Sequence, residues 1–558
     1  MTETSPKTAS QPGSQPAVAD LIDELKWRGL LHQCTDTEGL RAHLADPANA
    51  PRKIYSGFDP TAPSLTIGNL VPIMLLAHVK RAGHIPVVLQ GGGTGLIGDP
   101  SGKSAERQLN TAETVAANVE AQRPIFDAVL GKVEGPAHEI ANNLDWLGGL
   151  GYIEALRDIG KHFSVNMMMQ KESVKARLEN REQGISYTEF SYMILQAYDF
   201  AYLSSHDGVT VQIGGSDQYG NIVAGISLIL TKYQEHTGEF RRSWHQASDE
   251  HLEALKSGDQ DRIDRAAERL RAEESLVNEK VAALEAELGI KISNHAYGIT
   301  APLVTKADGT KFGKTESGAV WLTAPRDSDT PEELKQRTSP YAYYQFWLNA
   351  TDDDATNWIK IFTFLGRDEI ESLIARHAEN PGARELQRTL AQQATTILHG
   401  EDAMLRAEAA GKALFSGEIA DLDEATLLEV LADVPSSDHD KADLAGSDDQ
   451  PGLDPIELLK RTGLASSNRE AREFLGNGSV SINGTKIDAE TRITAAHLLH
   501  GSLIAVRPAS DCLFLDRING TSPTNSRAGF TLHHGVNTFL RLGALGTQTA
   551  TLVKWGAI

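Results

Sequence analysis

Two lysines on either side of a Phe-Gly pair are the first residues of this chain whose types and spacing suggest chemistry. They lie in Lys311-Phe-Gly-Lys314-Thr315, just after Asp308-Gly309. Two ammonium groups on a glycine-containing loop suit a reaction that develops negative charge on a polyphosphate, because such a loop can close when the phosphates are present. A surface turn uses the same residue types, so the string alone leaves both interpretations open.

A second group of polar residues has the spacing of one helical face. Tyr192, Gln196 and Asp199 are separated by four and then three positions in an apolar and aromatic segment. Burying such groups costs about 1–3 kcal/mol each when they lack a partner. A small polar ligand would satisfy them, and so would an internal hydrogen-bond network.

A glycine-rich loop provides a third candidate site. Gly93 to Gly98 has the G-x-G-x-x-G spacing, but the Asp-Pro-Ser-Gly that follows at 99–102 would break the helix that a dinucleotide site needs. Gly98 to Gly102 encloses three residues where a P-loop has four. The loop instead ends on Asp99, which could meet an ammonium group, while Lys103 and Arg107 could meet phosphates. A capping Asp and two solvated bases are the alternative.

Short apolar runs, each followed by a glycine loop, predict the elements that position these residues. Residues 85–89 and 209–213 are two such runs, with amphipathic stretches between them. The repeated order of strand, loop and helix over about 52–232 predicts an α/β domain with a parallel sheet, whose ligands bind at the carboxyl ends of the strands. Residues 21–48 are predicted to be helical, with an apolar face formed by Leu21, Ile22, Leu25 and Leu30.

The rest of the chain changes character several times. Residues 234–293 are rich in charged residues and alanine, with apolar residues every three to four positions, which predicts half of a coiled-coil-like helical hairpin without a catalytic role. Residues 331–432 have a helical pattern. The acidic, Ser-, Gly- and Pro-rich residues 433–452 predict a linker before a small module at 453–510. Residues 511–558 show no interpretable pattern.

Length and composition limit the class of protein. A chain of 558 residues is too long for one core. Its net charge of −22 excludes a uniformly basic nucleic-acid-binding coat, although not a local basic patch. Cys34 and Cys512 are the only cysteines, which excludes a disulfide framework. No apolar run is long enough to span a membrane, and residues 1–20 read as a disordered tail, so we expect a cytoplasmic protein.

Six motifs occur in one order, and together they resemble bacterial-type tyrosyl-tRNA synthetase, a class I aminoacyl-tRNA synthetase. They are Tyr55-Ser-Gly-Phe-Asp-Pro-Thr, Leu65-Thr-Ile-Gly-Asn69, Gly95-Leu-Ile-Gly-Asp-Pro, Phe190-Ser-Tyr192, Gly214-Gly-Ser-Asp-Gln218 and Lys311-Phe-Gly-Lys-Thr315. The resemblance covers about 52–232, 294–350 and 453–490. It implies a Rossmann-like catalytic α/β domain at 21–330, a helical tRNA-binding domain at 331–432 and a C-terminal S4-like α+β module.

The resemblance also implies residue roles. Tyr55 and Asp199 would bind the phenolic hydroxyl of tyrosine. The residues expected around its ammonium and carbonyl are Asp99, Tyr192, Gln196 and Gln218. The residues expected to contact ATP are Gly68, Asp217, Lys314 and Thr315. Those expected to stabilise the transferring phosphates are Thr66, Asn69, Lys103, Arg107, Lys311 and Lys314. The basic residues expected to bind RNA, near a hairpin that turns at Asn483-Gly484, are Lys460, Arg461, Arg469, Arg472 and Lys486.

The implied reaction joins ATP and L-tyrosine into tyrosyl-adenylate and pyrophosphate, and then transfers tyrosine to the 3′ end of tRNA(Tyr). It needs no side-chain nucleophile, so positioning and charge stabilisation must carry the catalysis. The family further implies Mg²⁺ bound with ATP, no metal site made by the protein alone, no membrane partner and a homodimer. The class signature that normally has two histidines reads Thr66-Ile-Gly-Asn69 here. This departure leaves a non-catalytic RNA-binding protein as the alternative.

Overall fold

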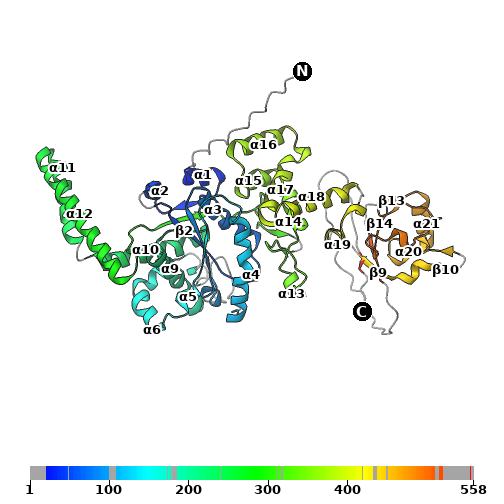
Figure 1. Cartoon of the computed structure of the whole chain (residues 1–558), viewed down its shortest axis with the longest axis horizontal. Coiled ribbons are helices and arrows are strands. Elements are labelled where there is room, and N and C mark those ends of the chain that lie inside the picture. Colours follow the sequence, from blue (N-terminus) through cyan, green and yellow to red (C-terminus); the bar gives the residue numbers. More distant parts are fainter. Residues whose placement is uncertain are drawn as a thin grey trace, which may run out of the picture. The chain divides into compact units, whose positions relative to one another are not determined.

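The computed structural model describes residues 20–47, 50–99, 109–171, 174–175, 178, 185–238, 241–310, 312–315, 318–416, 419–431, 436–447, 450–508, 514–519 and 553–554. The chain forms two compact units. One contains residues 1–337 and 356–370, and the other contains residues 338–355 and 371–558. Figure 1 labels many of the elements of both units.

The first unit is built on a six-stranded sheet with the order β1-β6-β5-β2-β3-β4. Its strands are β1 (Gln33–Cys34), β2 (Lys53–Phe58), β3 (Ile85–Gln90), β4 (Glu139–Asn142), β5 (Val209–Gly215) and β6 (Tyr297–Ala301). All neighbouring strands are parallel except β1 and β6. The central strands are buried on both faces, which explains their continuous apolar sequences. The predicted parallel sheet is therefore confirmed.

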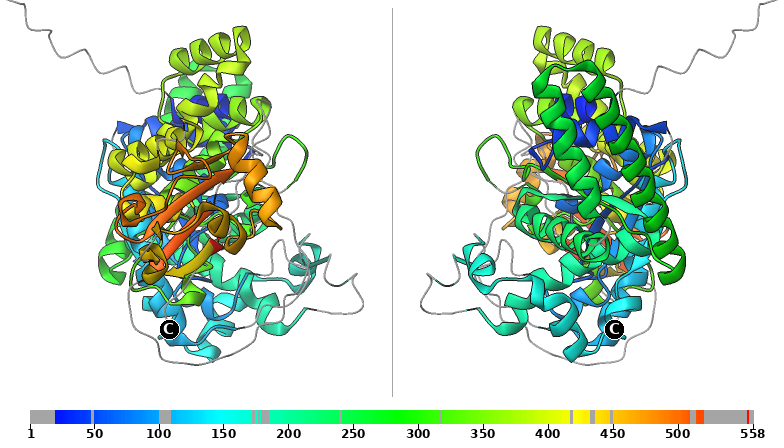
Figure 2. Two further views of the ribbon diagram at one scale, coloured as in Figure 1. Left: turned by 90° about the vertical axis from the view of Figure 1, so that its right-hand side faces the viewer. Right: turned by 90° about the vertical axis from the view of Figure 1, so that its left-hand side faces the viewer.

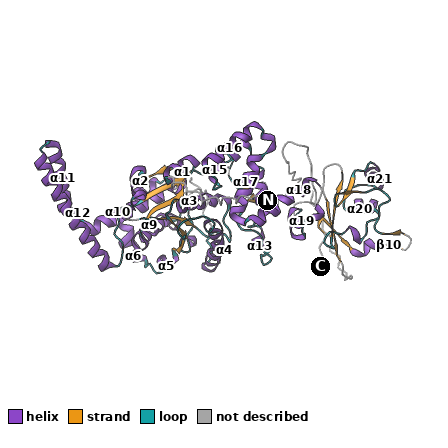
Figure 3. Ribbon diagram, turned by 45° about the horizontal axis from the view of Figure 1, so that its top comes forward, coloured by secondary structure: helices purple, strands orange, loops and turns teal. Residues whose placement is uncertain are grey.

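Helices cover both faces of this sheet. Helices α3 (Leu70–Arg81) and α4 (Ala112–Leu130) pack together on one face, and α9 (Tyr187–Asp207) and α10 (Tyr219–Thr237) pack together on the other. Figure 3 shows the strands between these helices. Phe200 of α9 and Leu228 of α10 belong to the same core cluster as Tyr55 of β2. The predicted helical face of Tyr192, Gln196 and Asp199 is part of α9.

The prediction that residues 21–48 are helical is wrong in part, because a strand interrupts the helices. The chain forms α1 (Leu21–Arg28), β1 and α2 (Thr37–Ala45). Gly29 ends α1 with a left-handed backbone (φ 75°), and Asp36 begins α2 by accepting a hydrogen bond from the Gly39 amide. These two caps end one helix and begin the next, although the apolar spacing along the sequence showed no sign of the break.

Helices α11 (Arg241–Ser257) and α12 (Gln260–Leu288) form the predicted hairpin between α10 and β6. Figure 2 shows the two helices side by side. Ala247, Ala254 and Val277 are the buried residues of this pair, so its apolar seam is narrow.

The second unit begins with helices, as the pattern over 331–432 predicts. They are α14 (Pro340–Leu348), α17 (Glu385–His399), α18 (Glu401–Ser416) and α19 (Glu424–Val430). Three shorter or boundary elements complete this region of the chain: α13 (Pro331–Leu334), α15 (Asp352–Ile361) and α16 (Arg367–Glu379). Trp347 and Tyr343 of α14 are fully buried where α14 contacts α17 and α18.

The C-terminal module contains two short helices and a sheet of order β13-β12-β14-β15-β9-β16. Its elements are β9 (Ser436–Asp440), α20 (Pro455–Arg461), α21 (Asn468–Gly476), β12 (Val480–Ile482), β13 (Thr485–Lys486), β14 (Leu503–Pro508), β15 (Phe514–Asn519) and β16 (Val553–Lys554). Asn483 and Gly484 join β12 to β13 with positive φ at both positions, as a type I′ turn requires. The predicted hairpin is confirmed.

The acidic segment predicted as a linker over 433–452 contributes to this sheet, so that prediction is wrong in part. Strand β9 pairs in parallel with β15, and Asp438 and His439 are buried. Polar composition concealed the strand, because its burial comes from pairing with residues 514–519, in the tail where the sequence shows no pattern.

Candidate active site at the carboxyl edge of the sheet

The ends of four parallel strands bring the candidate site together. Asp59 follows β2, the glycine loop that ends at Asp99 follows β3, Asn143 follows β4, and Asp217 follows β5. Strands β2 and β5 are neighbours, but the chain leaves β2 toward β3 on one side of the sheet and leaves β5 toward β6 on the other side. Ligands of open α/β sheets bind at such a switch point, outside the carboxyl ends of the strands.

Two buried oxygens in this region lack hydrogen-bond partners among the described residues. They are the Oη of Tyr55 on β2 and the Oε1 of Gln196 on α9. The Tyr55 side chain is 1% exposed, and its pKa is raised well above its ordinary value by burial and then by the charge of Asp199. The structure thus brings Tyr55 and Asp199 close together around groups that a polar ligand would satisfy.

Asp199 is held by two donors that the sequence did not reveal. Trp146 Nε1 donates to Asp199 Oδ1 at 2.8 Å, and Asn143 Nδ2 donates to Asp199 Oδ2 at 2.9 Å. Burial raises the pKa of Asp199 to about 7, although both hydrogen bonds oppose this shift. Asn143 could have been predicted as a site residue because it directly follows β4, but nothing in the sequence marks Trp146 as one.

Asp59 is a further site residue that sequence reasoning missed, although it lies inside the first motif. It accepts hydrogen bonds from Tyr192 Oη at 2.9 Å and from Thr94 Oγ1 at 2.7 Å. Burial, followed by Asp59, raises the pKa of Tyr192 well above its ordinary value. A Cβ atom on Gly91 would lie 2.2 Å from Asp59 Oδ1, so this loop needs glycine for close approach.

A chain of side chains runs from a lysine to Asp99. Lys171 Nζ donates to Asn221 Oδ1 at 2.5 Å, and Asn221 Nδ2 donates to Gln218 Oε1 at 2.9 Å. Gln218 Nε2 then donates to Asp99 Oδ2 at 2.7 Å. The structure therefore brings the predicted residues Asp99 and Gln218 into contact. It adds Lys171 and Asn221, which were not predicted.

Thr66 and Asn69 bond to each other at the start of α3. Asn69 Oδ1 accepts hydrogen bonds from the Thr66 amide at 3.1 Å and from Thr66 Oγ1 at 2.9 Å. This arrangement fixes the Asn69 oxygen toward Thr66 and leaves Nδ2 as the donating end of the Asn69 amide. Gly68 between them is exposed.

The lysine loop, residues 311–315, is held against the Thr66–Asn69 segment by backbone hydrogen bonds that involve Gly313. The Ile67 amide donates to the Val320 carbonyl at 2.9 Å, and the Val320 amide donates to the Gly313 carbonyl at 3.0 Å. The ring of Phe312 stacks on Phe362, with 5.1 Å between the centroids. A cavity of about 130 Å³ lies where the Thr66–Asn69 segment meets the lysine loop, and its lining includes Gly68 and Phe312.

Several predicted phosphate contacts cannot be placed by this geometry. Lys103, Arg107 and Lys311 lie outside the described residues. Lys314 and Thr315 form strand β7 (Lys314–Thr315), which pairs with β8 (Gly318–Ala319), and only their backbone is described.

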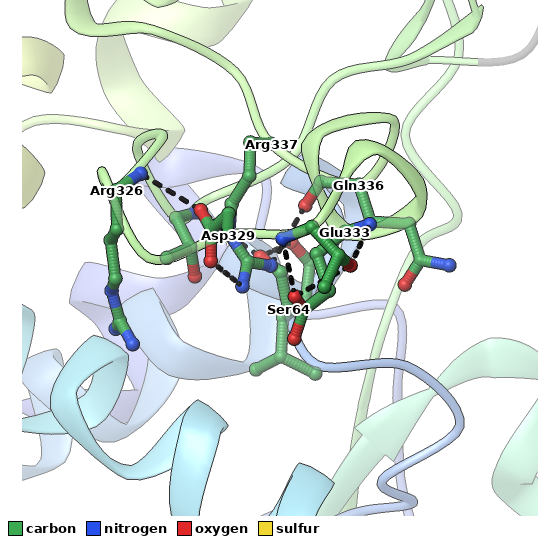
Figure 4. A network of polar contacts seen from close by, with 9 residues as sticks. Ser64, Arg326, Asp329, Glu333, Gln336 and Arg337 are labelled. Atoms are coloured by element: carbon green, nitrogen blue, oxygen red, sulfur yellow. Dashed lines mark hydrogen bonds and ion pairs between the residues drawn. The ribbon is translucent and has the colours of Figure 1, made fainter.

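A buried ion pair supports the chain that follows this loop. Arg337 Nε and Nη2 both lie 3.0 Å from Asp329 oxygens, and the two side chains are 2% and 5% exposed. Figure 4 shows this pair in its network with Ser64 nearby. Ser64 Oγ accepts a hydrogen bond from the Thr323 amide at 3.1 Å. Residues 322–337 are thereby tied to the chain that leads into Thr66.

The predicted RNA-binding residues fall into two groups in the second unit. Arg461 forms ion pairs with Asp443 and Glu457, and Lys460 lies 3.8 Å from Glu457. Arg469, Arg472 and Lys486 are exposed and form no ion pair with another described residue. The second group therefore offers the cations best placed for phosphates.

Two protein-family models match this chain. A model of tRNA synthetases class I (W and Y) matches residues 47–243 and 274–416. A model of the tyrosine–tRNA ligase SYY-like C-terminal domain matches residues 429–508. Within the described part of the chain, no helix combines the length and apolar character needed to cross a membrane.

Individual relatives narrow the assignment. The tyrosine–tRNA ligase of Bacillus caldotenax is 42% identical over 500 residues, which covers 89% of this chain and 99% of that protein. The Aliivibrio fischeri tyrosine–tRNA ligase is 41% identical over 88% of this chain and 97% of its own length. The solved C-terminally truncated mitochondrial tyrosyl-tRNA synthetase of Aspergillus nidulans superposes with a TM-score of 0.53 at 26% identity, covering 71% of this chain and 94% of that one.

The chain therefore belongs to the class I tRNA synthetases for tryptophan and tyrosine. Within that family its place is among the tyrosine–tRNA ligases. The resemblance seen in the six sequence motifs and the expected class I fold are confirmed. The family model leaves out residues 244–273, which form most of the α11–α12 hairpin.

Proposed function

We propose that this chain activates L-tyrosine with ATP and transfers it to the 3′ end of tRNA(Tyr), and that the buried pocket around Tyr55 and Asp199 selects the amino acid. The observation that carries the proposal is the pair of buried oxygens, Tyr55 Oη and Gln196 Oε1, without described partners beside the Asp199 carboxylate. A phenolic hydroxyl placed between Tyr55 and Asp199 would form hydrogen bonds with the Tyr55 hydroxyl and with the Asp199 carboxylate.

This pocket chemistry also discriminates between aromatic amino acids. Phenylalanine would leave the Tyr55 hydroxyl and the Asp199 carboxylate without a ligand, and a site built to bind a hydroxyl rejects an analogue that lacks it. Tryptophan brings no hydroxyl either. Asp199 already receives two hydrogen bonds, so it is fixed in position to accept a third.

The other end of the pocket suits the amino and carboxyl groups. Asp99, Tyr192 and Gln196 would surround the ammonium, and Asp59 adds a carboxylate bonded to Tyr192. The tyrosine carboxylate would then attack the α-phosphate of ATP while Gln218 faces the carbonyl side. Because no covalent enzyme intermediate is required, the protein must hold these groups in line.

Charge on the phosphates would be shared among several donors. In our proposal Asn69 donates through Nδ2, the end of its amide left available by Thr66. Lys103, Arg107, Lys311 and Lys314 supply cations, while Gly68, Asp217 and Thr315 contact ATP. The described residues contain no cluster of three or more His, Cys, Asp or Glu that could hold a metal ion. In this proposal Mg²⁺ is the ion carried by ATP, and it neutralises phosphate charge.

Transfer requires a tRNA contact, which we assign to the C-terminal module. Its exposed Arg469, Arg472 and Lys486 have no ion-pair partner among the described residues, so they are open to phosphates. We place this work in the cytoplasm, where protein synthesis occurs.

We also infer a homodimer. The short helices between β4 and α9 carry apolar side chains in solvent, including Tyr152 at 64%, Ile153 at 72% and Val165 at 58% exposure. These residues lie in and around α6 (Tyr152–Glu154) and α7 (Val165–Gln170). A second copy of the chain would cover such a patch.

Exchange of labelled pyrophosphate into ATP, measured with each of the twenty amino acids, tests the activation step. We expect exchange with tyrosine alone, and loss of that exchange in Lys314→Ala. Folded protein that binds tRNA(Tyr) but shows no exchange would contradict the proposal and favour the non-catalytic RNA-binding alternative.

A further inference from the structure

We propose that Lys171 is a positioning residue for tyrosine activation: through Asn221 it fixes the direction of the Gln218 amide. This inference rests on the proposed function, because Gln218 faces the carboxylate of the bound amino acid in that proposal. Lys171 itself need not touch the substrate. Neither Lys171 nor Asn221 belongs to the motifs that identify the family.

The geometry is a continuous relay of three hydrogen bonds. Lys171 Nζ lies 2.5 Å from Asn221 Oδ1, Asn221 Nδ2 lies 2.9 Å from Gln218 Oε1, and Gln218 Nε2 lies 2.7 Å from Asp99 Oδ2. Gln218 Nε2 also lies 3.3 Å from Asp217 Oδ2. Asn221 is fully buried, so its amide has no solvent to turn toward.

The chemistry of the two ends sets the direction of the relay. An ammonium can only donate hydrogen bonds and a carboxylate can only accept them. The two amides between Lys171 and Asp99 must therefore both point their oxygens toward the lysine. Reversing either amide would bring two oxygens or two N–H groups face to face, which leaves buried polar atoms unpaired.

When substrate binds, the orientation of the Gln218 amide depends on Asn221 and Lys171. The tyrosine ammonium is drawn to Asp99 in the proposed complex, so it competes with Gln218 Nε2 for that carboxylate. Asn221 then remains as the partner that holds Gln218 Oε1 away from the reacting carboxylate. A Gln218 turned the other way would present an oxygen where negative charge gathers as the carboxylate attacks the α-phosphate, and would raise the barrier to that attack.

The environment of Lys171 fits a fixed internal cation. Burial lowers its pKa, while the charges of Asp99 and Asp217 act in the opposite direction. The aliphatic part of the side chain packs over Gly220, where an added Cβ atom would lie 3.5 Å from Lys171 Cγ. The lysine is thus held along its length, with its ammonium placed on Asn221.

The test measures the full-length protein by pre-steady-state tyrosyl-adenylate formation and by tyrosine binding at equilibrium. Asn221→Asp keeps an acceptor for Lys171 but removes the donor to Gln218. We expect Asn221→Asp and Lys171→Met each to lower the rate of adenylate formation about tenfold, the equivalent of one net hydrogen bond. The Kd for tyrosine should change less than about twofold, and Lys171→Arg should retain most of the rate.

A double-mutant cycle separates this role from a general effect on folding. If Lys171 and Asn221 act through Gln218, their substitution should add little once Gln218→Leu is present. Lys80→Met is the matched control, because Lys80 is a buried lysine that donates to the Leu130 carbonyl away from the site. It should lower stability without changing the rate in the folded fraction.

Three outcomes would overturn the inference. They are unchanged rates in Asn221→Asp, effects that simply add to those of Gln218→Leu, and a Kd for tyrosine that rises as much as the rate falls. Should Lys171→Met fail to fold, the isosteric Asn221→Asp carries the same test. Tyrosine-dependent exchange by the unsubstituted chain is measured first. If this exchange is absent, the proposed function and this inference are both refuted. If it is present but the substitutions leave the rate of adenylate formation unchanged, the inference alone is refuted.

Discussion

Gly313 of the lysine loop lies directly against Ile67 of the Thr66–Asn69 segment. A Cβ atom on Gly313 would come within 2.3 Å of Ile67 Cγ2, and Gly313 also has a left-handed backbone with φ 77°. The two segments that the proposed reaction needs on either side of ATP are therefore in contact, although Ile67 and Gly313 are 246 positions apart in sequence. The two segments can approach this closely because Gly313 has no side chain.

Gly313→Ala should disturb this contact and lower the rate of adenylate formation. Gly309→Ala is a matched control, because Gly309 has φ 80° but nothing within 4 Å of an added Cβ atom. The left-handed conformation costs roughly 1–2 kcal/mol for any residue with a Cβ atom, so both variants share that strain. Only Gly313→Ala should also lower kcat for pyrophosphate exchange; equal kcat losses in the two would show that the contact with Ile67 is not needed.

Tyr55→Phe should erode discrimination between tyrosine and phenylalanine. Losing one hydrogen bond of about 0.5–1.5 kcal/mol predicts a fall of about 2–12-fold in the ratio of kcat/KM values for the two amino acids. Tyr343→Phe removes another buried tyrosine hydroxyl, in α14 of the second unit. That control should leave the ratio unchanged. An unaltered ratio in Tyr55→Phe would remove Tyr55 from the pocket.

Asp199 should make stability depend on pH. Burial raises its pKa in the folded chain from the ordinary 3.8 to about 7, so the folded state holds a proton that the unfolded state releases. The free energy of unfolding, relative to Asp199→Asn, should therefore fall as pH rises from about 4 to about 7 and stay level above that. Urea unfolding followed by tryptophan fluorescence measures this difference. A rise over the same window would mean that the bonds from Asn143 and Trp146 outweigh burial.

Replacing both Arg469 and Arg472 with alanine should weaken tRNA binding without slowing adenylate formation. Each lost phosphate contact should reduce the slope of log K against log salt concentration by about 0.7–0.9. Arg461→Ala is the control, since Arg461 is already paired with Asp443 and Glu457 and should change the slope less. A slope unaffected by the double substitution would place the tRNA phosphates elsewhere.

Local periodicity predicted much of the fold and part of the site. The apolar runs at β3 and β5 and the helical spacing of Tyr192, Gln196 and Asp199 are properties of neighbouring residues, so they can be read along the chain. Asn143, Trp146 and Lys171 all lie in the connection from β4 to α9 and join the site through contacts with residues distant in sequence, and only the position of Asn143 after β4 marks such a role. Strand β9 was missed for the same reason, because its partner β15 lies in a distant segment.

The α11–α12 hairpin has a consequence for local opening. Helices that bury only Ala247, Ala254 and Val277 along their shared seam gain little from packing, and neither helix takes part in pairing β5 with β6. The hairpin should therefore unfold as its own cooperative unit and exchange its amide hydrogens well before those of the sheet. A protease that cuts near its tip at Gly258 would sever the chain while β2, which carries Tyr55, and β5, which leads to Asp217, stay paired.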